Sequence, residues 1–200
     1  MKRIVPVALA LLALTVPTLA QAPRGGGAPA APIALEAGAS QAEVDRALLA
    51  APDNLKAAAT VIKWKPDVSG YTTLRKGTNR MVCFDKSGLP GQLAFSIECT
   101  SIANLDRAQQ NMKFEAEADR AKRQAALDAA EKDGTRAKPE FGSVWYHVMG
   151  ASQEQARHHM TIAVPGATTQ SLGLPDTGQQ GGVWIMNAGT TTAHLMTPGE

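Results

Sequence analysis

The segment LRKGTNRMVCFDKSGLPGQLAFSIECT, residues 74–100, contains the only two cysteines of the chain, Cys83 and Cys99, with 15 residues between them. An even number of cysteines in an exported protein is typical of a disulfide rather than of free thiols. In the chain-entropy model, closing a loop of about 15 residues stabilises a domain by roughly 3 kcal/mol. We therefore expect a structural disulfide between Cys83 and Cys99.

The same segment has the alternation of β-strands. Met81 and Cys83 share one face of a strand predicted over 80–84, because successive side chains of a strand point to opposite faces. A second strand is predicted over 93–98, after the turn sequence LPG. Upstream, β-branched and aromatic residues predict a hairpin with strands at 59–64 and 71–75.

The N-terminus has the pattern of a secretory signal peptide. Lys2 and Arg3 precede an apolar stretch over 4–16, and small residues allow cleavage near Ala20. The apolar stretch is too short to cross about 30 Å of hydrocarbon, so we expect no membrane span in the mature chain. Residues 1–20 are thus predicted to be a signal peptide, and the protein to be exported to the periplasm or secreted.

Residues 21–34, rich in Gly, Ala and Pro, lack the apolar periodicity of a folded element and predict a flexible linker. Residues 35–200 then form a predicted single globular domain, which is the default at this length. The leader carries two of the 20 basic residues, so the remainder balances the 18 acidic ones. This neutrality, with no basic block among aromatics, argues against nucleic acid as a partner.

Two helices are predicted from local signals. Ser40 and Glu43 form a capping box at the start of a helix over 41–51. Residues 102–133 contain no Gly or Pro and are rich in Ala, Gln and charged residues, which predicts one long helix. Its distal half is charged and poor in large apolar residues, so it is either a solvated face or a surface for a protein partner.

After Pro139 the strand pattern returns in four segments separated by Gly and Pro loops: 143–149, 158–164, 182–186 and 191–196. The sequence NAG at 187–189 predicts a hairpin between the last two. The three tryptophans are expected to anchor a core that has few other aromatics, with Trp145 and Trp184 buried. The predicted fold class is α+β, an antiparallel sheet with one long helix packed on a face.

Three segments carry a family resemblance: LRKGTN at 74–79 followed by Cys83, HHMTIAVP at 158–165, and GGVWIMNAGTTTAHLMTP at 181–198. With these the chain resembles a group of uncharacterised exported bacterial proteins, over roughly residues 60–198. The resemblance implies that the three segments belong to one domain. It implies no activity, because none is established for that group.

Three of the four histidines precede a methionine by two positions, which places imidazole and thioether on the same side of a strand. Thioether sulfur selects Cu(I), and imidazole also suits copper. Cu(I) is therefore the candidate cofactor. The predicted metal ligands are His158, Met160, His194 and Met196, with His147 and Met149 as alternates. The competing interpretation is core packing, since methionine is a common core filler.

The sequence gives little support for an enzyme. The chain has no Gly-x-Ser-x-Gly elbow, no His-Glu-x-x-His and no phosphate-binding glycine loop, so we assign no catalytic residue. The leading hypothesis is an exported, non-enzymatic structural or binding module, with Cu(I) as its most specific ligand. The alternatives are a hydrolase that uses a histidine base, His194 or His158, and a protein-interaction module that uses the helix over 102–133.

Overall fold

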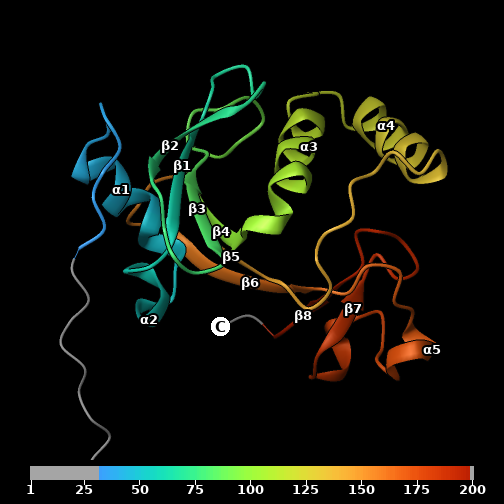
Figure 1. Ribbon diagram of the computed structural model, residues 1–200. Helices are drawn as coiled ribbons and strands as arrows, with labels where there is room; N and C mark the ends of the chain where they lie inside the picture. Colours follow the sequence, from blue (N-terminus) through green and yellow to red (C-terminus); the bar gives the residue numbers. More distant parts are fainter. Residues whose placement is uncertain (1–31, 199–200) are drawn as a thin grey trace, which may run out of the picture. The chain divides into compact units, whose positions relative to one another are not determined.

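The computed structural model describes residues 32–198, whose eight strands form one sheet in the order β2-β1-β3-β4-β5-β6-β8-β7 (Figure 1). Neighbouring strands are antiparallel except for β1 and β3, which are parallel. The mixed α+β class and the mostly antiparallel sheet are thus confirmed. The strands are β1 Thr60–Trp64, β2 Tyr71–Arg75, β3 Met81–Asp85, β4 Phe95–Ser101, β5 Val144–Gly150, β6 Arg157–Ala163, β7 Trp184–Met186 and β8 His194–Met196.

Eight short helices accompany the sheet in the described residues: α1 Gln41–Ala47, η1 Leu48–Ala50, α2 Asp53–Lys56, η2 Ile102–Asn104, α3 Leu105–Glu115, α4 Arg120–Lys132, α5 Thr169–Leu172 and η3 Gly178–Gln180. The predicted capping box is present, because Ser40 Oγ accepts from Glu43 N and the Glu43 carboxylate accepts from Ser40 N. The predicted helix over 41–51 is α1 followed by the 3₁₀ turn η1. The signal peptide and residues 21–31 of the predicted linker lie outside the described residues.

The two faces of the sheet have different covers. One, the disulfide face, carries the apolar residues of β1, β3, β4 and β5 that pack under α1 and η1: Val61, Met81, Cys83, Phe95, Ile97, Cys99 and Val148. The opposite face carries His147, His159 and His194 and is called the histidine face. On this face, Ile62, Phe84 and Trp145 pack against Ala108 and Met112 of α3. Figure 1 shows α1 and α3 on opposite sides of the sheet. The first part of the predicted long helix, α3, packs on one face of the sheet as expected, and α1 covers the other face.

The predicted helix over 102–133 is interrupted. Residues 116–119 are not helical, and they separate α3 from α4. Asp119 causes the new start, because its side chain accepts from Ala121 N and Lys122 N and thereby caps α4. Only Ala130 of α4 is buried, so nearly all of this helix faces solvent.

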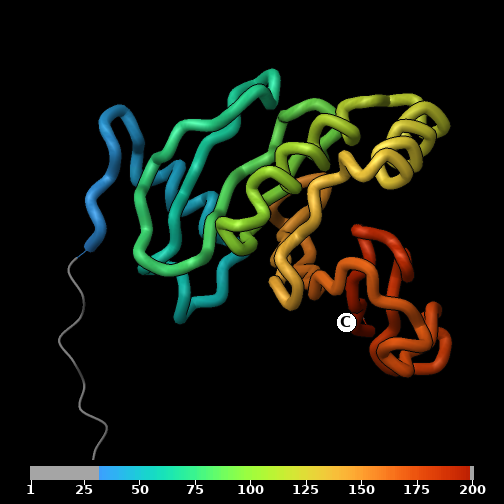
Figure 2. The backbone as a smooth tube through the Cα atoms, turned by 45° about the vertical axis from the view of Figure 1, so that its right-hand side comes forward, coloured from blue at the N-terminus to red at the C-terminus, as the bar shows by residue number. Residues whose placement is uncertain are grey.

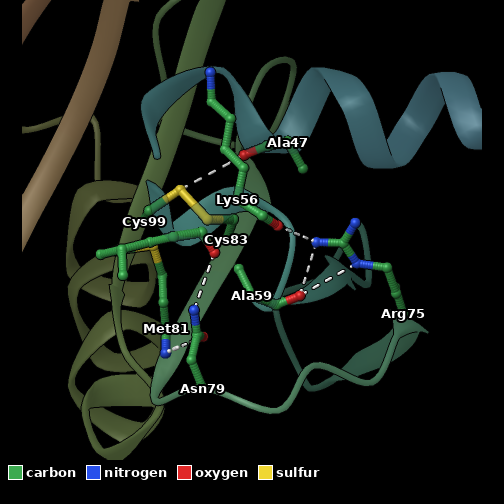
Figure 3. The surroundings of a disulfide bond; sticks show 9 residues. Ala47, Lys56, Ala59, Arg75, Asn79, Met81, Cys83 and Cys99 are labelled. Atoms are coloured by element: carbon green, nitrogen blue, oxygen red, sulfur yellow. Dashed lines mark hydrogen bonds between the residues drawn. A yellow bond between two sulfur atoms is a disulfide. The ribbon is translucent and has the colours of Figure 1, made fainter. Parts of the chain in front are cut away.

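Cys83 and Cys99 form the predicted disulfide (Figure 3). Their Cα atoms are 4.1 Å apart on directly opposite positions of β3 and β4, and both residues are fully buried. The backbone carbonyl of Ala47 lies 3.7 Å from Cys99 Sγ, so the bridge is enclosed between the sheet and the end of α1. This environment is that of a structural disulfide rather than of a reactive one.

The LRKGTN segment holds the junction between α2 and β1. Arg75 Nη2 donates to the carbonyls of Lys56 at 2.6 Å and Ala59 at 2.9 Å, as Figure 3 shows. The backbone of Asn79 donates to the Ala58 carbonyl, and its side chain bonds Leu55 O and Met81 N. The LRKGTN segment therefore has a structural role in this protein.

The C-terminal part of the chain gathers at the end of the sheet away from α1, where Figure 2 draws it in orange and red. β7 and β8 form the predicted hairpin, and Ile185 of β7 is fully buried. Trp145 is buried as predicted, but Trp184 is only half-buried. Within residues 32–198 no helix has the length and apolarity needed to cross a bilayer.

Candidate functional site

A cavity of about 420 Å³ opens on the histidine face, between the sheet and α3. Three of the four histidines line it, each from a different strand: His147 from β5, His159 from β6 and His194 from β8. Arg107 of α3 forms part of the opposite wall and is almost fully buried. A second hollow is also lined by three histidines, His147, His158 and His159, but these come from β5 and β6 alone.

A buried charged network forms one wall of this cavity. Lys86 Nζ donates to Glu98 Oε2 at 2.6 Å, and His147 Nδ1 lies 3.3 Å from the same oxygen. The side chains of Lys86 and Glu98 are only 10% and 5% exposed. Burial of the Glu98 carboxyl opposes its ionisation, but Lys86 and His147 outweigh this effect and lower the pKa of Glu98 to about 2. Glu98 is therefore an ionised carboxylate that holds His147.

His147 and His159 form a pair across β5 and β6. They occupy directly opposite positions, and their ring centroids are 6.0 Å apart with planes inclined by 31°. Partial desolvation lowers the pKa of His159, whose side chain is still exposed to solvent, and the imidazoles of His147 and His194 lower it further. A neutral imidazole at this position can accept a proton or bind a metal ion.

His194 belongs to a second group of soft side chains. Its Nδ1 lies 2.7 Å from the Thr192 carbonyl. A carbonyl only accepts, so Nδ1 carries the proton and Nε2 has a free lone pair. Met186 of β7 is directly opposite His194, and Met196 follows two positions along β8. All three therefore lie on the histidine face of the β7–β8 hairpin.

The structure does not bring the four predicted metal ligands together. His194 and Met196 share the histidine face, whereas His158 and Met160 lie on the disulfide face of β6. The reason is register: His159, not His158, is the β6 residue opposite His147. The alternates His147 and Met149 do share the histidine face and line the cavity.

Three residues of this site were missed from the sequence. Glu98 alternates with the buried Ile97 and Cys99, a pattern that indicates a solvent-facing residue. His159 and Met186 were not selected because only strand pairing shows what they face. Within residues 32–198, no three side chains among His, Cys, Asp and Glu are placed to hold one metal ion.

Comparison with known proteins finds no family model, no curated protein and no solved structure that matches this chain.

Proposed function

We propose that this protein is an exported Cu(I)-binding module whose ligands are His194, Met196 and Met186. The observation that carries the proposal is the pairing of β7 with β8. It places Met186 directly opposite His194 and places Met196 two positions along, all on one face. Directly opposite Cβ atoms in antiparallel strands are about 4.5–5.5 Å apart, and those of diagonal neighbours roughly 7–8 Å or less. Long methionine side chains can cover that distance.

The chemistry of the three side chains favours a soft ion. Thioethers bind Cu(I) in preference to harder divalent ions, and an imidazole completes a three-coordinate set. The Thr192 carbonyl fixes the His194 ring in the way that outer partners of metal-bound histidines do. Met186 is 39% exposed, so an ion can reach the hairpin from solvent.

The test is Cu(I) titration under reducing, anaerobic conditions, followed by thermal unfolding. A ligand that binds only the folded state at about 100 times its Kd stabilises it by about 2.7 kcal/mol. Met186→Leu and Met196→Leu keep side-chain volume, and such swaps usually cost less than about 1.5 kcal/mol in the apo protein. In both variants the copper-dependent increase in Tm should disappear.

Met160→Leu is the matched control, because Met160 has similar exposure and lies on the opposite face of the sheet. It should keep the full copper-dependent increase. An equal increase in wild type, Met186→Leu and Met196→Leu would refute the proposal and leave these methionines as packing residues.

A second candidate function is hydrolysis with His147 as general base, favoured by the contact between His147 Nδ1 and the ionised Glu98. A carboxylate in this position orients the imidazole and stabilises its protonated form, so that Nε2 can take a proton from water. Screening of ester and phosphoester substrates tests this function. Activity that survives His147→Asn would exclude His147 as the base.

A further inference from the structure

The cavity of the histidine face holds a second group of metal-binding side chains that the Cu(I) proposal does not use. We infer that His147 and His159 form an open binding site for a divalent transition-metal ion, such as Zn(II), Ni(II) or Cu(II). This site lies on β5 and β6 and contains no residue of the β7–β8 hairpin. It differs from the proposed Cu(I) site in both its ligands and its class of metal.

The spacing of the two rings suits a shared ion. An imidazole nitrogen bonds zinc at about 2.0–2.1 Å, which puts the metal roughly 3 Å from the ring centroid. Two rings that share one metal at an angle of about 110–140° therefore have centroids roughly 5–6 Å apart. The centroids of His147 and His159 are 6.0 Å apart, a separation at the upper end of this range.

The partner of His147 is the kind found behind metal-bound histidines. Such a histidine usually donates its other ring N–H to a carboxylate, which fixes the ring and increases the basicity of the ligating nitrogen. Glu98 Oε2 lies 3.3 Å from His147 Nδ1 and is itself held by Lys86. Nδ1 is thereby engaged, and Nε2 has no hydrogen-bond partner among the residues that the structure describes.

The nature of the ion follows from the ligand set. Imidazole suits Zn, Ni and Cu ions of intermediate softness, and both protein ligands here are imidazoles. No third His, Cys, Asp or Glu within residues 32–198 completes the set. The remaining coordination positions would then be filled by water or by a small ligand in the cavity, as in metal sites that keep an open position.

The experiment is calorimetric titration of metal-free protein, purified without a polyhistidine tag, with Zn(II) and separately with Ni(II). We expect one equivalent to bind, and we expect His159→Gln to weaken binding at least tenfold. His158→Gln is the matched control, because it removes the neighbouring imidazole on the other face of the same strand. Its affinity should stay within twofold of wild type.

Two further variants separate this inference from the other proposals. Glu98→Gln keeps both ligands and should weaken binding by about 10–100-fold, the usual effect of losing an outer-shell partner. Met196→Leu should leave Zn(II) and Ni(II) binding unchanged, although it removes the Cu(I) response. Urea unfolding of each variant confirms that it is folded at the titration temperature.

Three results would overturn the inference: no binding by wild type, an equal loss in His158→Gln and His159→Gln, or a loss in Met196→Leu. An equal loss would indicate non-specific binding by surface histidines. A loss in Met196→Leu would assign the ion to the hairpin. Loss of the Cu(I) response alone leaves the divalent site intact, so the two proposals fail separately.

Discussion

Replacing Glu98 by glutamine removes the central charge of the buried network while keeping the shape of the side chain. In the wild-type protein the Glu98 carboxylate accepts from Lys86 at 2.6 Å and lies 3.3 Å from His147 Nδ1. The substitution leaves the Lys86 ammonium, which is only 10% exposed, without its hydrogen-bonded carboxylate, so that Glu115 is the opposite charge that still acts on it. A buried ion that has lost its partner retains the full cost of its desolvation.

The loss of stability follows from the pKa shift of Glu98 and from the cost of breaking buried ion pairs in other proteins. The pKa of Glu98 is lowered from 4.5 to about 2, which corresponds to about 3 kcal/mol of folding free energy. Removing one member of a buried ion pair costs about 3–5 kcal/mol in other proteins. The free energy of unfolding of a small domain is about 5–15 kcal/mol, so Glu98→Gln should remove a large share of the stability.

The pH dependence provides a second signature. Glu98 has a lower pKa in the folded state than in the unfolded state, so its contribution is complete above about pH 4.5. As the pH falls from 4.5 towards 2, the contribution is lost because the unfolded state binds the proton more tightly. Glu98→Gln should therefore lower stability at pH 7 and flatten its decrease over this acidic range.

The assay is urea unfolding at pH 7 and at several points between pH 5 and 2, with Glu43→Gln as the control. The pKa of Glu43 is also lowered to about 2, by Lys63 and Ser40, but this carboxylate lies at the surface, where water screens the interaction. Glu43→Gln should therefore cost much less. Equal losses in the two variants, or an unchanged acid profile in Glu98→Gln, would refute the reasoning.

Three further predictions concern packing and the disulfide. Gly77→Ala should lower the free energy of unfolding in urea by about 1–3 kcal/mol, because a Cβ at this position would lie 2.3 Å from backbone atoms. Gly70→Ala is the control: a Cβ there meets nothing within 4 Å, so the free energy of unfolding should change by about 0.5 kcal/mol or less. Trp145→Ala should lower the free energy of unfolding by about 3–5 kcal/mol, and Trp184→Ala should lower it less, because the Trp184 side chain is only half-buried. A larger loss in Trp184→Ala than in Trp145→Ala would contradict the assigned burial. Reduction should lower stability by roughly 3 kcal/mol and add two hydrogen atoms to the mass, and an unchanged mass would exclude the disulfide.

The candidate site illustrates how far sequence reasoning reaches. The His-x-Met spacing correctly places each such pair on one face of its strand, because alternation is a local property of the extended backbone. It does not tell which face. His158 and His159 must point in opposite directions, but only the pairing of β6 with β5 shows that His159 faces the cavity. Glu98 was missed for the same reason. Its partners are Lys86 and His147, and His147 lies on a strand about fifty residues further along the chain.

The sequence by itself determined the local elements and the disulfide. The capping box at Ser40 and the hairpin signals act over a few residues. The two cysteines of the chain allow only one pairing. No distant contact is therefore needed to predict these features. Tertiary structure decided which face α3 covers and which histidines share a cavity. These outcomes depend on strand register and on packing between segments far apart in the chain, and a one-residue change of register would exchange the two faces.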